Sequence, residues 1–279
     1  MKDGKKRKYV DLHIHSTYSD GSLSIREIVE QASTRQLSAV SLTDHDCVAG
    51  VQELKNLADT IGVEVVPGVE ISSLHENSDV HILGYYFDIH NPDLVARLDE
   101  IRAIRIERAK KIVERLNNKG VLLRFERVQE FSKGYSLGRP HIASALIAEE
   151  HVDSVAEAFD RYLGNHTEFY IPIQKLTPVE AIALIKKAGG MAVMAHPHVT
   201  ARDDLLEAFV KQGLDGLEVF HPKMPYGAFK SYRQFCHKHN LLETGGSDSH
   251  GSVNGEPGLG MVRTPYTALE KMKKRKGLI

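Results

Sequence analysis

Histidines and carboxylates recur in this chain at positions where a short apolar segment ends. The first case is the run VDLHIH at residues 10–15, in which two imidazoles stand two residues apart in a strand-like stretch. Because side chains at i and i+2 of a strand point to the same face, His13 and His15 are expected to project together, as a metal-chelating pair does. The other candidate ligands follow later segments of the chain: Asp20, His45, Glu70, His81, His196, Asp248 and His250.

These residue types predict a particular kind of metal site. Neutral imidazole combined with carboxylate suits Mn, Fe or Zn, whereas Ca and Mg prefer shells made of oxygen alone. The set contains no thiolate, which argues against a structural zinc site. The candidates are too many for one ion, so we expect two or three divalent transition metals that share carboxylates. Closely spaced metals bind both oxygens of an in-line displacement at phosphorus and provide a hydroxide nucleophile at neutral pH, which indicates hydrolysis of phosphate esters.

The periodicity of the chain predicts which elements position these residues. Strands are expected at residues 9–15, 38–43, 63–69, 80–87, 191–195, 216–220, 241–245 and 258–262. Helices are expected between them at residues 23–36, 48–61, 178–188, 202–212 and 228–239. This alternation predicts an α/β fold with a mostly parallel sheet and helices outside, in the form of a distorted (β/α)7 barrel. The active site of such a barrel lies at the carboxyl ends of its strands.

Residues 92–172 depart from this alternation. They contain a long charged segment with helical periodicity at 94–117, and shorter helices are expected at 124–132, 140–149 and 155–163. We therefore expect residues 1–91 and 173–279 to form the barrel domain, and residues 92–172 to form a helical insertion that caps the active site. Arg102, Arg105 and Arg108 follow one another at a spacing of three, a pattern more typical of a solvated helix face than of a nucleotide-binding one.

The composition excludes several classes of function. The formal net charge is −1, so no global basic field would bind duplex nucleic acid stably. Cys47 and Cys236 stand at no recognisable ligand spacing, which predicts no disulfide framework and a reducing compartment. No apolar run approaches the about 20 residues that cross a bilayer, and no apolar core follows the basic residues 1–8 as it would in a signal peptide. We expect a cytoplasmic protein without a membrane partner.

In combination, the motifs resemble those of a known superfamily. DLHIHSTYSDG, SLTDHD, PGVEIS, the strand with His81, MAHP and GGSDSH follow one another as in the polymerase and histidinol phosphatase (PHP) superfamily, over nearly the whole chain. The helical insertion and its GRPHIA segment at residues 138–143 are similar to those of stand-alone bacterial PHP phosphoesterases. That branch includes nucleoside 3′,5′-bisphosphate phosphatases and 5′-to-3′ exoribonucleases of short RNA. The resemblance implies a phosphoesterase that acts on a nucleotide or a short oligonucleotide.

The resemblance also implies roles for individual residues. Three metal sites are implied, and a hydroxide between metals would be the nucleophile. The first site would consist of His13, His15, Glu70 and Asp248, and Glu70 would bridge to a second site that His81 and His196 complete. The third site would consist of Asp20, His45 and His250. Arg139 would bind a substrate phosphate through its planar guanidinium. His141 is expected either to contact phosphate or to pack at a helix start. Ser249 stands where the family more often has an aromatic residue.

Other polar residues are candidates for supporting roles. His221 follows an apolar strand, so it faces the predicted mouth and would donate a proton to the leaving oxygen or hydrogen-bond a ligand. Asp44 and Asp46 flank His45 and are predicted to orient imidazoles.

Three other functions remain open at this point. The first is a histidinol-phosphate phosphatase, which higher turnover of histidinol phosphate than of nucleotides would reveal. The second is a non-catalytic accessory module, in which a chelator would lower stability without abolishing any activity. The third is hydrolysis of C–N bonds by an enzyme of the amidohydrolase type, which shares the HxH strand but uses a carbamylated lysine for which no clear candidate strand exists here.

Overall fold

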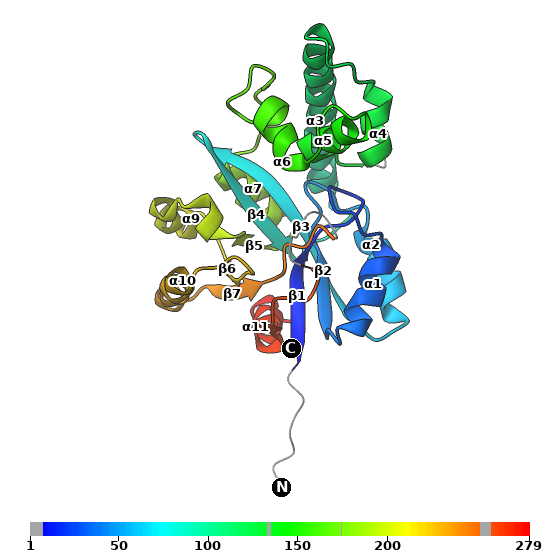
Figure 1. Ribbon diagram of the computed structural model, residues 1–279. Coiled ribbons are helices and arrows are strands. Elements are labelled where there is room, and N and C mark those ends of the chain that lie inside the picture. The colour runs from blue at the N-terminus through cyan, green and yellow to red at the C-terminus, as the bar shows by residue number, and fades with distance from the viewer. Residues whose placement is uncertain (1–7, 133–134, 174, 252–257) are drawn as a thin grey trace.

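The protein folds around one curved mixed sheet, which a computed structural model describes over residues 8–132, 135–173, 175–251 and 258–279 (Figure 1). The eight strands lie in the order β7-β6-β5-β4-β3-β2-β1-β8. They are β1 (Tyr9–Ile14), β2 (Ala39–Leu42), β3 (Glu64–His75), β4 (Ser78–Tyr85), β5 (Met191–Met194), β6 (Gly216–Phe220), β7 (Leu242–Gly245) and β8 (Thr264–Pro265). The predicted absence of a signal peptide concerns residues 1–7, which lie outside the described residues.

Backbone hydrogen bonds bring the two halves of the sheet together at the end of β1. The N–H of His15 donates to the carbonyl of Ser249, and the N–H of Asp248 donates to the carbonyl of His13, each at 2.9 Å. Ile14 and Ser249 also form a parallel bridge, so the segment that follows β7 runs beside β1. The sheet therefore nearly closes, and the expected α/β fold with a distorted barrel is confirmed.

One long strand of the sheet, β4, runs in the opposite direction to its neighbours. β1, β2 and β3 pair in parallel, as do β5, β6 and β7, but β4 is antiparallel to both β3 and β5. β3 continues as far as His75, and the chain then turns through Glu76, whose φ is 54°, directly into β4. The predicted mostly parallel sheet is therefore confirmed, with β4 reversed, because a crossover helix is needed between parallel neighbours and none separates β3 from β4.

The last strand that the sequence predicts, at residues 258–262, does not form. Residues 258–261 form a turn in which the N–H of Met261 donates to the carbonyl of Gly258. Gly260 adopts a φ of 73°, and its N–H donates to the buried Oδ2 of Asp11 at 2.7 Å. This hydrogen bond holds the turn against β1, and the strand that pairs antiparallel with β1 is β8 instead.

Helices cover the outside of the barrel, and two of them begin with a capping box. In α1 (Ile25–Thr34) the cap is Ser24, which forms a capping box with Glu27. In α7 (Pro178–Lys187) Thr177 forms the same motif with Glu180. The remaining barrel helices are α2 (Val51–Asp59), α8 (Pro197–Thr200), η2 (Asp203–Leu205), α9 (Leu206–Lys211), α10 (Tyr226–Lys238) and α11 (Tyr266–Lys276).

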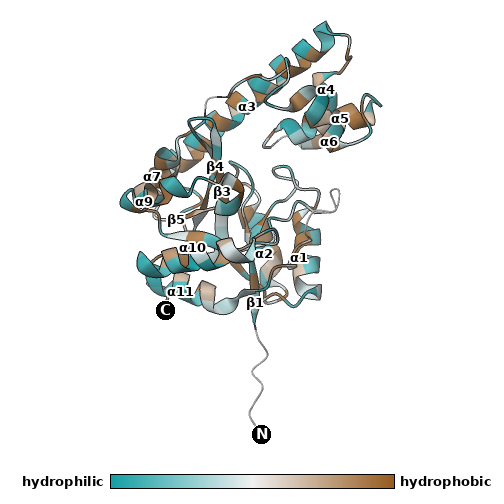
Figure 2. Ribbon diagram, turned by 60° about the vertical axis from the view of Figure 1, so that its left-hand side comes forward, coloured by the Kyte–Doolittle hydropathy of each residue, from teal (hydrophilic) through white to brown (hydrophobic). Residues whose placement is uncertain are grey.

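Residues 92–172 form helices and turns, and the part of this range that the structure describes contains no strand. The helices are α3 (Pro92–Asn118), α4 (Phe125–Ser132), α5 (Arg139–Ala148), α6 (Val155–Ala158) and the π-helical turn η1 (Phe159–Leu163). Figure 2 shows α3 leaving the barrel, with α4, α5 and α6 beside its far end. Over the described ranges, every helix is too short or too polar to span a lipid bilayer.

The long helix α3 belongs to two hydrophobic cores. Leu94, Leu98 and Ile101 in its first half pack into the barrel core with Ile182 of α7. Its second half lies in a separate core with α4, α5 and α6. The helix therefore fixes the small helical core relative to the carboxyl ends of the strands.

Candidate metal centre

One buried carboxylate gathers most of the predicted histidine ligands. Glu70 lies in β3, and its side chain is 1% exposed. Five imidazoles have a ring nitrogen within 3.4 Å of its oxygens: His81 at 2.9 Å, His45 at 3.0 Å, His15 and His196 at 3.2 Å, and His13 at 3.4 Å. These histidines come from β1 and the residue directly after it, from β4 and from the segments after β2 and β5, so the fold assembles the cluster from distant parts of the chain.

The remaining predicted ligands complete the same pocket. Asp248 Oδ1 lies 3.3 Å from His13 Nε2 and 3.2 Å from His15 Nε2. Asp20 lies within 3.8 Å of both His45 and His250. Side chains able to hold an ion together form three overlapping groups: His15, Asp20, His45 and His250; His13, His15 and Asp248; and His45, Glu70 and His81.

This grouping differs in part from the partition that the resemblance implies. His15 and His45 each belong to two groups, and His45 meets Glu70 and His81 in place of His196. His196 still contacts Glu70, through Nε2. All the predicted ligands therefore meet in one pocket, while their distribution among individual ions stays a prediction.

The chemistry of the pocket fits divalent transition metals. Among the described residues, several buried polar atoms here have no hydrogen-bond partner: His13 Nε2, His15 Nε2, Asp20 Oδ1, Glu70 Oε2 and His196 Nδ1. Leaving such atoms unsatisfied is unfavourable, and a cation that accepts their lone pairs removes the penalty. The rings of His15 and His250 also stack at 4.1 Å, a spacing that neutral, ligating imidazoles tolerate better than charged ones.

Burial and mutual attraction set the charge of the pocket. Burial alone would raise the pKa of Glu70, but the nearby imidazoles of His45, His81 and His13 hold that pKa well below its usual range. Burial lowers the pKa of His45 to about 3, so this ring is neutral at pH 7. Burial also acts to lower the pKa of His15, but its contacts with the carboxylates of Asp248 and Glu70 raise it to about 10. A metal must therefore displace a proton from His15.

Two of the ligands follow their strands in a strained backbone conformation. His196, after β5, has a φ of 26°, and Asp248, after β7, has a φ of 51°. Residues other than glycine in this region are strained by about 1–3 kcal/mol each, and such strain is concentrated at functional sites. In the second case a hydrogen bond from Ser247 N–H to Asp11 Oδ1, at 2.8 Å, holds the turn against β1.

A glycine allows β7 and β1 to approach each other at this point. A Cβ at Gly246 would lie 2.3 Å from the backbone nitrogen of His13 and 2.4 Å from its Cβ. We expect Gly246→Ala to displace His13, to destabilise the fold by about 1–3 kcal/mol and to weaken metal binding. Gly227→Ala on α10 is the control, since a Cβ there meets nothing within 4 Å. Thermal unfolding and metal titration would check this, and a wild-type result for Gly246→Ala would contradict it.

Sequence reasoning missed Glu218, which lies in β6. Its side chain is fully buried, and its two oxygens contact His13 Nδ1 at 3.0 Å and the backbone N–H of His196 at 2.8 Å. One signal was available, because a lone carboxylate inside the apolar run GLEVF at residues 216–220 needs a buried partner.

The predicted roles of Asp44 and Asp46 are not supported in their direct form, because neither carboxylate hydrogen-bonds an imidazole. Asp44 accepts hydrogen bonds from the backbone of Ser16 and from the hydroxyls of Ser16 and Ser19. Asp46 pairs with Arg105 and accepts the N–H of Ser72. Each carboxylate therefore reaches the histidines only through a serine, whose Oγ lies 3.5 Å from His15 Nδ1 in one case and from His45 Nδ1 in the other.

The helical segment 92–172 contacts the loops that hold the ligands. Its His141 donates from Nε2 to the carbonyl of Ser19 at 2.9 Å and accepts the N–H of Gly138 through Nδ1. With both ring nitrogens bonded to the backbone, the predicted phosphate contact of His141 is not supported, and packing at the start of α5 accounts for the residue. Ser136 N–H also donates to Tyr18 O, and the rings of Tyr18 and Tyr135 lie 4.3 Å apart.

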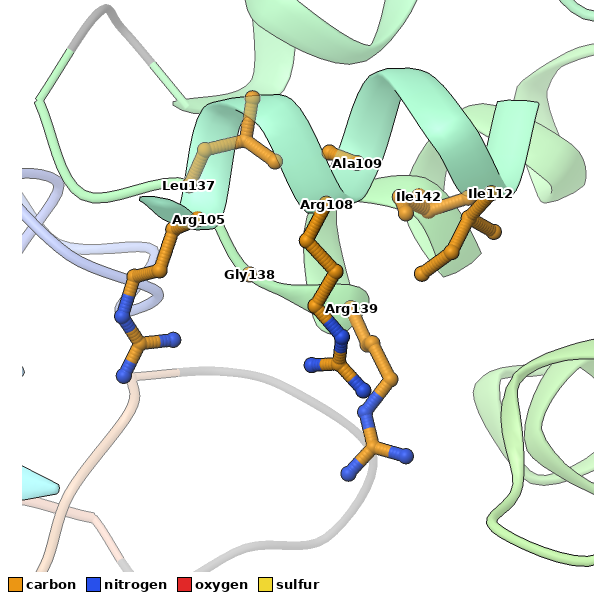
Figure 3. A pocket seen from close by; sticks show the side chains of 8 residues that line it. All are labelled: Arg105, Arg108, Ala109, Ile112, Leu137, Gly138, Arg139 and Ile142. Carbon is orange, nitrogen blue, oxygen red and sulfur yellow. The ribbon is translucent and has the colours of Figure 1, made fainter. Parts of the chain in front are cut away.

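Arginines of the helical segment converge on one side of a small pocket, shown in Figure 3. Arg105 and Arg108 of α3 lie there beside Arg139 of α5. The expectation of a solvated arginine face therefore fits Arg102, which pairs with Asp99 at the surface, but is wrong for the other two arginines of α3. It fails because α3 turns this face toward α5 and the barrel mouth.

His221 lies at the same mouth, as its strand predicts. It is buried, and its Nε2 stands 3.6 Å from Asp248 Oδ2 without a hydrogen-bond partner among the described residues. Its ring centroid is 6.0 Å from that of His196. This position lies beside the ligand cluster and outside the three groups able to hold an ion.

Known proteins share this architecture over almost the whole chain. The chain is 34% identical over 253 residues to a 5′-3′ exoribonuclease of Haemophilus influenzae, covering 88% of this chain and 90% of the relative. It is 31% identical over 252 residues to a 3′,5′-nucleoside bisphosphate phosphatase of Chromobacterium violaceum, covering 88% of each. A solved structure described as a metal-dependent phosphoesterase, from Bifidobacterium adolescentis, matches with a TM-score of 0.89 at 34% identity and covers 96% of each chain.

The PHP domain family matches residues 11–187, from β1 to the end of α7. This span includes His13, His15, Asp20, His45, Glu70 and His81 of the candidate centre. The resemblance that the motifs indicated is therefore confirmed. The chain belongs to the PHP family, and by its fold and its relatives it is a phosphoric ester hydrolase.

Proposed function

We propose that this protein hydrolyses phosphate esters of nucleoside 3′,5′-bisphosphates or of short oligonucleotides, with two or three bound Mn, Fe or Zn ions. The observation that supports this most directly is the ring of five imidazoles around Glu70, because such a set of N and O ligands has no use without cations. The names of the relatives support the nucleotide substrates. Cys47 and Cys236 are both buried and free, which supports the expected reducing cytoplasm.

The ligands are proposed to act as the resemblance implies. His13, His15, Glu70 and Asp248 would hold one ion, Glu70 would bridge to the ion of His81 and His196, and Asp20, His45 and His250 would hold a third. Bound metals would supply Lewis acidity at the phosphoryl group and would activate water. His221, with a free Nε2 directed at the mouth, would donate a proton to the leaving oxygen.

We also propose that residues 1–91 and 173–279 act as one barrel domain and that residues 92–172 act as its cap. The separate hydrophobic core of α3 to η1 supports this division. The Arg105–Asp46 ion pair and the His141–Ser19 contact support the position of the cap over the carboxyl ends of β1 and β2.

The arginine pocket gives the cap a role in binding the substrate. Arg139 Nη1 donates to Leu163 O and to Asn165 Oδ1, which fixes the guanidinium in place. Burial and the nearby charge of Arg139 lower the pKa of Arg108 to about 10. Within the described residues, neither Arg108 nor Arg139 has a carboxylate within 4.0 Å. Half-buried guanidiniums that repel each other favour an anion, and a second phosphate of the substrate is the anion that we propose.

A substrate panel with one substitution in the cap tests this function. We expect the metal-loaded enzyme to release phosphate from nucleoside 3′,5′-bisphosphates and short RNA faster than from histidinol phosphate. Arg139→Lys removes the planar fork while keeping the charge, so KM for bisphosphates should rise about 10- to 100-fold. Turnover of p-nitrophenyl phosphate, which has no second phosphate, should stay unchanged.

Arg102→Lys is the matched control, because Arg102 is an arginine of α3 that pairs with Asp99 at the surface. Faster turnover of histidinol phosphate than of any nucleotide would contradict the proposed substrate. A chelator that lowers the melting temperature of a protein with no activity on the panel would point to an accessory module instead.

A further inference from the structure

We propose that Glu218 is a positioning residue whose single carboxylate fixes two ligands of the metal centre at once, the imidazole of His13 and the backbone of His196. Glu218 lies in the middle of β6, between β5, which leads to His196, and β7, whose following segment pairs with the end of β1. The inference rests on the metal centre proposed above, but not on the identity of its substrate.

The first carboxylate oxygen selects the ring nitrogen that His13 presents to a metal. Glu218 Oε1 lies 3.0 Å from His13 Nδ1, and an ionised carboxylate only accepts hydrogen bonds. Nδ1 must therefore hold the proton, which leaves the lone pair on Nε2. Nε2 is the atom that lies 3.4 Å from Glu70 and 3.3 Å from Asp248, and it has no hydrogen-bond partner among the described residues. The contact thus directs the ligating nitrogen into the pocket.

The second oxygen holds the strained turn after β5. Glu218 Oε2 accepts the backbone N–H of His196 at 2.8 Å. His196 has a φ of 26° and stands directly before Pro197, so no continuing strand supports this conformation. The turn places His196 Nε2 3.2 Å from Glu70. Glu218 therefore links the two sides of the Glu70 cluster.

Ordinary packing does not account for this carboxylate. Glu218 is fully buried, and its acidic charge has no lysine or arginine within 4.0 Å among the described residues. Its partner in an ion pair is His13 alone. A buried charge of this kind is unfavourable compared with an apolar residue of the same size. Its presence in β6 therefore indicates a function such as fixing a metal ligand.

Glu218→Gln tests the proposal with almost no change in volume. The amide replaces one carboxylate oxygen with an NH2 donor, so in the wild-type geometry it cannot accept from both His13 and His196. Either the His13 ring loses the acceptor of its Nδ1–H, or the backbone N–H of His196 loses its acceptor. We expect Mn²⁺ affinity, measured by titration of the metal-free protein, to fall about 10- to 100-fold. Glu243→Gln on the neighbouring strand β7 is the control, since Glu243 pairs with Arg233 at the surface.

A second readout reports the tautomer without any assay of activity. In wild-type protein labelled with ¹⁵N-histidine and loaded with Zn²⁺, we expect His13 to be protonated at Nδ1 and bound at Nε2. Protonation at Nε2 in the wild type would overturn the proposal, even if Glu218→Gln fails to fold. Unchanged Mn²⁺ affinity in a folded Glu218→Gln protein would overturn it as well. Neither readout uses a substrate, so inactivity toward nucleotides alone would count against the proposed function and not against the role of Glu218.

Discussion

Glu70→Gln is expected to lower kcat for phosphate ester hydrolysis by about 10³-fold or more, since metal-ion stabilisation of the transition state amounts to several kcal/mol. The protein should also be isolated with less bound metal. Glu70 is the one carboxylate that five imidazoles contact, so removing its charge affects every group of ligands around it. The glutamine amide keeps the volume of the glutamate side chain but cannot bridge two cations. Steady-state kinetics at saturating metal, together with elemental analysis, would measure both effects.

Glu64→Gln is the matched control for this substitution. Glu64 is the first residue of the same strand, β3, and pairs there with Lys273. Its replacement should leave kcat and metal content unchanged. Activity of Glu70→Gln within about tenfold of the wild type would show that the carboxylate is not shared between catalytic metals, and the centre proposed here would have to be abandoned.

The sequence predicts the ligands of this centre because strand geometry is local. Alternation of side chains makes the HxH pair in β1 recognisable without any knowledge of the rest of the fold. Ligands after β2, β5 and β7 are equally predictable, because parallel strands present their carboxyl ends to one edge of the sheet. His81 is placed in another way. It lies within the antiparallel strand β4, opposite Ser72 of β3, and not at the carboxyl end of a parallel strand.

Residues that act across the fold are harder to predict from the sequence. Glu218 has an effect only because β6 lies close to both His13 and the turn at His196, and nothing in its local sequence names those partners. Asp46 was expected to orient an imidazole, but it pairs with Arg105, which comes from a helix of the cap. Such pairs depend on the angle at which α3 leaves the barrel, and the spacing of arginines along one helix does not specify that angle.

The two cores of α3 connect the arginine pocket to the barrel. Leu94 and Leu98 attach the start of the helix to the barrel, so Arg105, two turns further on, reaches the loop after β2. Arg108 lies one turn beyond, where it meets Arg139 of α5. A substrate phosphate in this pocket would therefore contact only residues of the helical segment, whereas the candidate metal ligands belong to the barrel.

Removal of the metals is expected to make stability depend on pH with a defined sign. In the metal-free protein, contacts with the carboxylates of Asp248 and Glu70 outweigh burial and raise the pKa of His15 from 6.5 to about 10. A raised pKa in the folded state contributes stability that is fully present below pH 6.5 and is lost as the pH rises toward 10. Glu70, Asp20 and Asp248 have lowered pKa values, so their contribution is lost in acid. The metal-free melting temperature should therefore be highest near pH 5–6 and fall toward pH 9.

The metal-loaded protein should behave in the opposite way over the same range, because a metal replaces the proton on His15 and its binding strengthens as protons become scarce. At a free metal concentration of 100 times Kd, the gain is about 2.7 kcal/mol, or roughly 5–10 °C in Tm. The difference in Tm between loaded and metal-free protein should widen from pH 6 to pH 9, as thermal scans would show. His15→Gln should flatten the metal-free curve above pH 6.5, whereas His237→Gln on the exposed face of α10 should not. A constant difference in Tm at all pH values would mean that no histidine proton is exchanged for metal, which contradicts an imidazole-ligated centre.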